Sequence, residues 1–111
     1  MKNLFLVLVA VATLTACNKE DRLYHKSIQG EWYFDHGYPN DNPSMNATPL
    51  NNKSLIITKD KYTDNDRTNA DYEVVSDGMI RVSGTTLRLR VENSQAVLDN
   101  GTFTFKYNFV K

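Results

Sequence analysis

The sequence predicts an all-β domain, a small antiparallel meander of seven or eight strands that forms a barrel or a rolled sheet. Apolar and polar residues alternate in short runs, as in Thr86–Glu92 and Thr102–Val110, and this alternation is typical of strands with one buried face. Turn-forming pairs such as Asp77-Gly78 and Asn100-Gly101 separate the runs and favour hairpins. An open sheet would leave unpaired edges, so closure is favoured.

The strands are expected in a simple order along the chain, and their inward positions form the core. Residues 37–52 hold all three prolines and show no alternation, which predicts the longest and most exposed loop. We expect strands at Gly30–His36, Lys53–Lys59, Lys61–Asp66, Asp71–Ser76, Met79–Ser83, Thr86–Glu92, Gln95–Leu98 and Thr102–Val110. The expected core comprises Trp32, Phe34, Leu55, Ile57, Tyr62, Tyr72, Val74, Ile80, Val82, Leu87, Leu89, Val91, Val97, Phe103, Phe105 and Phe109.

Length, charge and cysteine content exclude several classes of protein. The 111 residues leave no room for two ordinary domains,. One cysteine excludes an internal disulfide,. Thirteen basic residues balance thirteen acidic ones, whereas a nucleic-acid-binding domain normally carries a basic face. We therefore expect a single domain that is a monomer and does not bind nucleic acid.

The N-terminal segment has the pattern of an export signal. Lys2 precedes an uncharged apolar run from Leu4 to Ala12, and small residues follow up to Ala16-Cys17. This order of basic, apolar and small residues is that of a secretory signal. The apolar run is short for a segment that would span the roughly 30 Å hydrocarbon core of a bilayer. Residues 1–16 are therefore expected to be removed.

The residues Leu14-Thr15-Ala16-Cys17 resemble the lipobox of bacterial lipoproteins. The resemblance implies that Cys17 is lipidated on its sulfur, that cleavage makes it the N-terminus, and that the acyl chains anchor the protein. Asn18, which is not Asp, favours the outer membrane in this family, on the periplasmic face or at the cell surface. Residues 17–29 would then be a tether with a short helical turn that turns Leu23 and Ile28 toward a domain at 30–111.

A second resemblance concerns the domain. The opening Gly30-Glu31-Trp32 resembles the Gly-x-Trp motif of lipocalins, in which the tryptophan closes one end of a β-barrel. The Gly-Thr-Thr-Leu-Arg-Leu run at 84–89 and the aromatic last strand are similar to those of small bacterial lipocalin-like lipoproteins. The chain is shorter than typical lipocalins, and large aromatic residues on its inward faces can fill a small barrel.

Two polar clusters are the main candidates for chemistry. Asp35 and His36 could act as a base or bind a metal, but adjacent strand residues point to opposite faces. Asp64-x-Asp66 begins like a calcium loop, yet Asn69 and Val75 stand where such a loop needs Gly and Glu. We therefore expect no catalytic residues, no metal site and no cofactor, and we interpret the protein as not an enzyme.

Two functions remain open. In the first, a membrane-anchored envelope lipoprotein binds a protein or glycan partner through loop 37–52 and the neighbouring rim, because long loops in compact domains are disproportionately functional. The alternative to that interpretation of the loop is a spacer without fixed structure. In the second function, a lipocalin-like carrier holds a small apolar ligand. The candidate ligand-binding residues are Trp32, Tyr38, Phe103, Phe105 and Tyr107.

The lipobox interpretation predicts the effect of one substitution. Cys17→Ser removes the sulfur that would carry the diacylglycerol, so the protein should stay unprocessed or be released from the membrane. Mass spectrometry and membrane fractionation measure both outcomes. The interpretation is wrong if Cys17→Ser and the parent chain show the same mass shift and the same membrane fraction.

Overall fold

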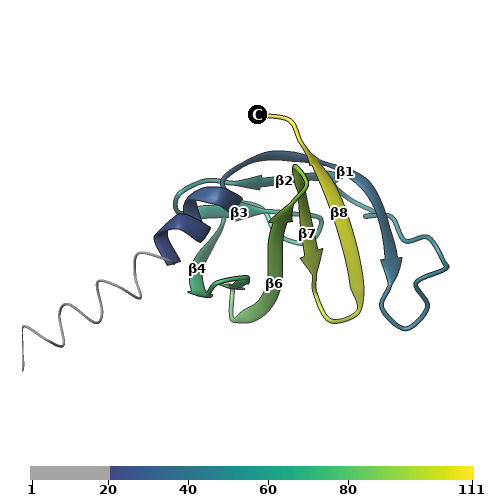
Figure 1. The fold of residues 1–111 in the computed structure, drawn as a ribbon. Coiled ribbons are helices and arrows are strands. Elements are labelled where there is room, and N and C mark those ends of the chain that lie inside the picture. Colours follow the sequence, from purple (N-terminus) through teal and green to yellow (C-terminus); the bar gives the residue numbers. More distant parts are fainter. Residues whose placement is uncertain (1–20) are drawn as a thin grey trace, which may run out of the picture.

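The fold is a closed antiparallel barrel of eight strands in sequence order (Figure 1). The structure is a computed structural model that describes residues 21–111; Cys17, the expected site of lipidation, and the expected signal at 1–16 lie outside the described residues. The strands are β1 (Gly30–Pro39), β2 (Ser54–Ile57), β3 (Lys61–Thr63), β4 (Ala70–Ser76), β5 (Met79–Val82), β6 (Thr85–Glu92), β7 (Gln95–Asp99) and β8 (Phe103–Phe109). The predicted all-β class and the antiparallel meander are confirmed.

Closure depends on pairing between the first and last strands. β1 and β8 are antiparallel, with Trp32 opposite Phe109 at one end of the ladder and Pro39 opposite Phe103 at the other. The tail extends this pairing, because the amide of Val110 donates to the carbonyl of Glu31 at 2.7 Å. The barrel therefore has no free edge that another chain could extend.

The β1 register contains a bulge that the sequence analysis missed. The pairing shifts between Phe34 and His36, so Asp35 is an extra residue in β1,. Beyond the bulge the alternation resumes, and Gly37 pairs with Phe105. The expected boundary at His36 is therefore wrong: residues 37–39 belong to the strand, and the long loop occupies residues 40–53.

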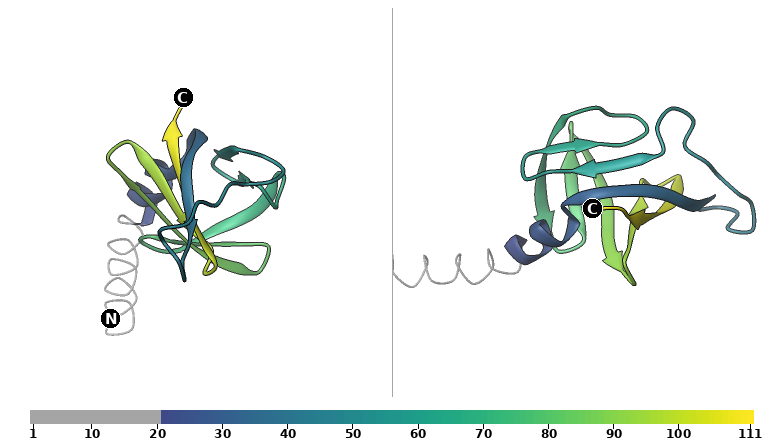
Figure 2. Two further views of the ribbon diagram at one scale, coloured as in Figure 1. Left: turned by 90° about the vertical axis from the view of Figure 1, so that its right-hand side faces the viewer. Right: turned by 90° about the horizontal axis from the view of Figure 1, so that it is seen from above.

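A meander places alternate connections at opposite ends of the barrel. Residues 58–60, 77–78 and 93–94 turn at one end, beside the helix formed by residues 21–28 and the C-terminal tail. We call this the helix end. The connections at 40–53, 64–69, 83–84 and 100–102 lie at the other end, which we call the loop end. Figure 2 shows loop 40–53 projecting on the side opposite the helix.

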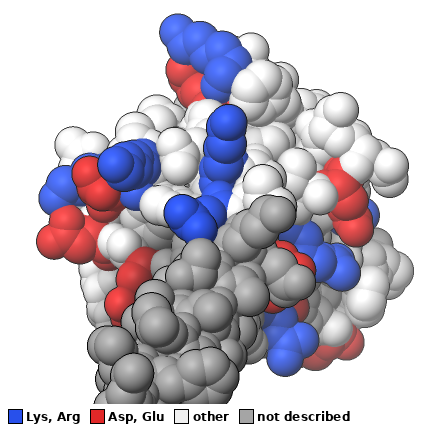
Figure 3. Space-filling view, turned by 60° about the vertical axis from the view of Figure 1, so that its left-hand side comes forward, with Lys and Arg blue, Asp and Glu red and all other residues white. Residues whose placement is uncertain are grey.

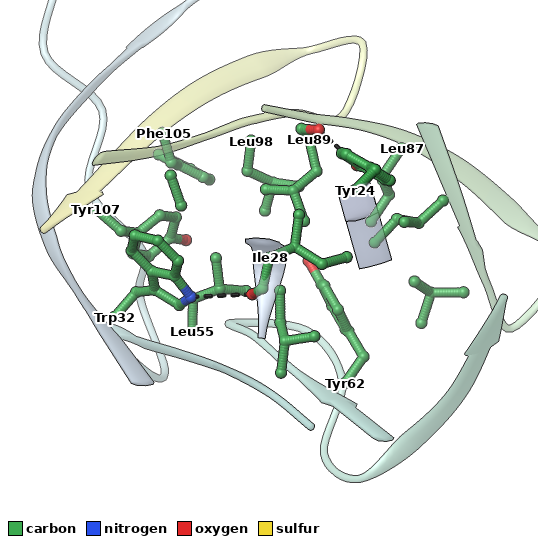
Figure 4. Packing of buried hydrophobic residues seen from close by; sticks show 14 residues of the cluster. Tyr24, Ile28, Trp32, Leu55, Tyr62, Leu87, Leu89, Leu98, Phe105 and Tyr107 are labelled. Carbon is green, nitrogen blue, oxygen red and sulfur yellow. Dashed lines mark hydrogen bonds between the residues drawn. The ribbon is translucent and has the colours of Figure 1, made fainter. Parts of the chain in front are cut away.

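The helix closes its end of the barrel with two side chains one turn apart. Ile28 is fully buried and Tyr24 nearly so, because residues i and i+4 share a helix face. Tyr24 donates its hydroxyl to the Leu89 carbonyl, and Trp32 donates its ring N–H to the Ile28 carbonyl at 3.2 Å (Figure 4). Burial raises the pKa of Tyr24. The expectation that Leu23 faces the domain is wrong, since its side chain is 62% exposed.

The interior is filled by apolar and aromatic side chains. Tyr62 and Tyr107 are the largest of the fully buried ones. Figure 4 shows side chains from the helix and from strands on all sides meeting in the middle. Three expected core residues differ: Val91 and Phe109 lie at the helix end and are exposed, and Val97 faces outward in the β7 ladder although neighbouring side chains bury it. The confirmed core residues include Trp32, Leu55, Ile57, Tyr62, Ile80, Val82, Leu87, Leu89 and Phe105.

The contact between helix and barrel can be tested with two substitutions in one helix. Ile28→Ala removes a fully buried side chain and should lower the free energy of unfolding by about 2–5 kcal/mol. Leu23→Ala in the same helix removes a mostly exposed side chain and should change it by about 0.5 kcal/mol or less. Urea denaturation followed by circular dichroism measures both. Equal effects would mean that the helix does not pack into the barrel.

Candidate functional site

Loop 40–53 is held to the barrel at its start by one asparagine. The backbone N–H of Asn40 donates to the Thr102 carbonyl at 2.9 Å, and its side-chain amide donates to Asp99 at 2.8 Å. The Asn40 side-chain oxygen accepts from the Thr104 hydroxyl at 2.6 Å. These bonds join the first residue of the loop to the β7–β8 hairpin, so the two connections form one surface.

The middle of the loop packs against β1 at a glycine. The Ala47 amide donates to the Gly37 carbonyl at 2.9 Å. A Cβ at position 37 would stand 2.5 Å from the Phe105 ring and 3.0 Å from the Ala47 carbonyl oxygen, so a side chain does not fit there. Pro49 is buried in the same region. The close approach at Gly37 thus lets the loop lie against the strand.

The end of the loop is fixed by the neighbouring connection. The side-chain oxygen of Asn65, in residues 64–69, accepts from the amides of Asn51 at 2.7 Å and Asn52 at 3.4 Å. The Phe34 amide then donates to the Lys53 carbonyl at 2.8 Å. Loop 40–53 is therefore bonded to the barrel at its start, middle and end, unlike a spacer without fixed structure.

This bonded loop nevertheless exposes two large apolar side chains. Leu50 is 92% exposed and Met45 is 55% exposed. An exposed leucine on a surface is ordinary by itself, but here the backbone on both sides of Leu50 is fixed by the packed Pro49 and by the bond from Asn51. The sequence pattern contained no signal for this, because neither side chain belongs to an alternating run.

The candidate ligand-binding residues lie in two different environments. Trp32, Phe105 and Tyr107 are buried in the core, and Phe103 packs against it while partly exposed. Tyr38 stands opposite Thr104 on the outward face of β1, so the structure does not bring it together with the other four. Four hollows at the surface of residues 21–111 are lined by none of these five residues.

The acidic cluster supports the turn at 64–69. Asp64 is buried, and its carboxylate accepts from the Tyr62 hydroxyl at 2.8 Å and from Arg67 at 3.2 Å. It also accepts from the amides of Asp66 and Arg67. Burial raises the pKa of Tyr62, and the Asp64 carboxylate adds to that rise. Within residues 21–111 no group of three or more His, Cys, Asp or Glu side chains could hold a metal ion.

Asp35 and His36 are together, against the expectation from simple alternation. The bulge turns both outward, and His36 Nδ1 lies 2.6 Å from the Asp35 carboxylate. Asn108 and Gln95 also donate to Asp35. The hydrogen bond from His36, followed by those of the two amides, holds the pKa of Asp35 below its usual value. No serine or cysteine side chain is bonded to this pair among the described residues.

The bond from Asn65 to the loop gives a testable prediction. Asn65→Ala leaves two loop amides without their acceptor, which should lower stability by about 1 kcal/mol and speed hydrogen exchange at Asn51 and Asn52. Asn46→Ala, an exposed asparagine in the same loop, is the control and should leave exchange unchanged. Mass-spectrometric hydrogen exchange measures both. Unchanged exchange in Asn65→Ala would show that the bond does not order the loop.

Comparison with known proteins adds no relative. A scan against protein-family models found no match, and searches of curated proteins and of solved structures found no significantly similar chain. No helix among residues 21–111 has the length and apolar character that a membrane span requires. Any function for this chain is therefore argued from its own residues.

Proposed function

We propose that the protein is a lipid-anchored envelope lipoprotein, located at the outer membrane, that binds a protein or glycan partner through the loop end of its barrel. The observation that carries this proposal is the bonded loop 40–53, which exposes Leu50 almost completely and Met45 by about half. Apolar side chains presented on an ordered backbone lose little conformational entropy on binding, which favours affinity. The protein would act as a monomer without a cofactor.

The position of the lipid supports this use of the loop end. The resemblance of Leu14-Thr15-Ala16-Cys17 to a lipobox puts the acyl chains at Cys17. The helix that follows is described over residues 21–28 and packs at the helix end. Residues 18–20 are too few to carry the domain far from its anchor. The loop end would therefore face away from the membrane, where a partner can reach it.

The barrel also agrees with a lipocalin-like domain. The Gly30-x-Trp32 opening resembles that family, and Trp32 bonds to the helix that closes one end of an eight-stranded meander. The carrier function is less well supported. A pocket for a small apolar ligand occupies roughly 300–1,000 Å³. The candidate residues Trp32, Phe105 and Tyr107 instead pack against other side chains in the core. We therefore place recognition on the outer surface.

Two serine substitutions test the partner-binding site. The double variant Met45→Ser and Leu50→Ser changes only exposed side chains, so the barrel should keep its melting temperature. If the loop carries recognition, affinity should fall about 30-fold or more, since a truncated hot spot costs ~2 kcal/mol. Crosslinking capture from envelope extract identifies the ligand, and titration with the purified protein or glycan then measures the change.

The control for this test lies on the side of the barrel. Tyr33→Ser removes an outward side chain of β1 that is also about half exposed, and it should leave binding unchanged. The proposal fails if the double variant binds as the parent does, or if Tyr33→Ser weakens binding equally. The first result would mean that recognition occurs elsewhere on the surface. The second would mean that the partner binds exposed apolar side chains non-specifically.

A further inference from the structure

The exposed apolar side chains of the barrel are concentrated at one end. Six of the nine large apolar residues that are exposed within residues 21–111 belong to the helix end. Only Met45 and Leu50 are at the loop end, and Tyr33 is on the side. The six residues at the helix end, which we call the apolar rim, are Leu23, Ile56, Val75, Val91, Phe109 and Val110.

The topology explains why these residues form a ring. β2, β4, β6 and β8 all run toward the helix end. Each carries an exposed apolar residue at its last or second-last position: Ile56, Val75, Val91 and Phe109. Leu23 stands on the helix beside Val91, and a hollow of about 580 Å³ lies between the helix and β6. The rim therefore surrounds the helix by which the chain enters the barrel.

The length of chain before the helix restricts what can cover this rim. Cys17 and Asp21 are separated by residues 18–20 alone. Four Cα–Cα steps, each spanning at most about 3.6 Å, keep Asp21 within roughly 15 Å of Cys17. If the lipid on Cys17 lies in a bilayer, the helix end must lie close to that bilayer. A surface held at such a distance meets it at high effective concentration, so a weak contact is sufficient.

The charges at the helix end do not form a basic field. Lys111 lies 3.6 Å from Glu31, and the helix and turns of this end carry Arg22, Lys26 and Lys59 together with Asp21, Asp60 and Asp77. Arg90 lies 3.8 Å from Glu92. Figure 3, seen from the side on which the chain enters, shows blue and red side chains interspersed. Charges of both signs give this end little net attraction to anionic lipid, so we look to the apolar side chains for the contact.

We propose that the apolar rim is a membrane-docking surface, which rests at the headgroup level of the bilayer that holds the lipid on Cys17. Docking fixes the barrel with its loop end outward instead of leaving it free to tumble on the anchor. The inference rests on the proposed lipid anchor and adds a second, non-covalent contact with the same membrane. It concerns the opposite end of the barrel from the partner-binding loop.

Spin labels at the two ends test the docking. The lipidated mature protein is reconstituted in neutral phosphatidylcholine vesicles with one added thiol, from Val110→Cys in the rim or from Leu50→Cys as the control. Modification of Cys17 leaves the added cysteine as the only free thiol. We expect the nitroxide at position 110 to collide several-fold less with an aqueous nickel chelate, and more with oxygen, than the one at 50.

A variant of the rim separates apolar docking from mere proximity. Leu23→Ser and Val91→Ser, combined with the label at 110, should return the collisions with nickel to the level seen at 50. Val75→Cys is a second reporter on another strand and should behave as position 110 does. Equal access to nickel at 110 and 50 in the parent would overturn the proposal. Protection that requires anionic lipid would also overturn it, because the contact would then be electrostatic.

The anchor and the docking can fail separately. If the parent floats with the vesicles and carries the lipid mass, but position 110 stays accessible to nickel, the docking is wrong and the anchor stands. If the parent neither floats nor carries the lipid, the anchor is wrong and the docking falls with it.

Discussion

The pairing of β1 with β8 is the interaction on which the rest of this structure depends. It joins the ends of a chain that would otherwise be an open sheet, and it requires the backbone of Gly37 to approach the Phe105 ring more closely than any side chain allows. Because closure brings Glu31 beside Lys111, the first strand begins and the last strand ends at the helix end. The long loop between β1 and β2 lies at the other end, away from the helix (Figure 2).

Closure of the barrel also limits the space inside it that a ligand could occupy. A small eight-stranded barrel has an interior that side chains can fill, and here Tyr62, Tyr107 and Trp32 occupy it while Ile28 closes one opening. A buried pocket has little room in this arrangement. We therefore propose that function lies at the two ends, which differ in kind: one presents apolar side chains on a hydrogen-bonded loop, the other a ring of apolar side chains around the helix.

The sequence was most informative where alternation was regular. The run from Phe103 to Phe109 and the turn at Asn100-Gly101 predicted the last hairpin, and the structure confirms it. Prediction failed where one residue broke the period. The bulge at Asp35 shifted the alternation of β1, hid residues 37–39 within an expected loop, and brought Asp35 to His36. The position of this bulge depends on how β1 pairs with β8. The local sequence pattern of β1 therefore does not predict it.

The candidate site was less predictable than the fold for the same reason. A long, exposed loop was expected at residues 37–52, but the order of loop 40–53 comes from Asn65 and Thr102, which belong to other connections. Val91 and Phe109 satisfied the inward pattern, yet they occupy the ends of strands where the barrel stops covering them. Alternation assigns a residue to a face of the sheet, and only the staggered register shows how near it lies to an end.

The central claim is that the two ends of the barrel face different partners, and photocrosslinking in the intact envelope tests it most directly. A photoreactive residue is placed at position 50 in the loop, at 110 in the rim, or at 33 on the side of the barrel. The account predicts that position 50 captures a discrete protein or glycan partner, that position 110 captures lipid, and that position 33 captures neither efficiently. Capture of one and the same partner from all three positions would contradict it.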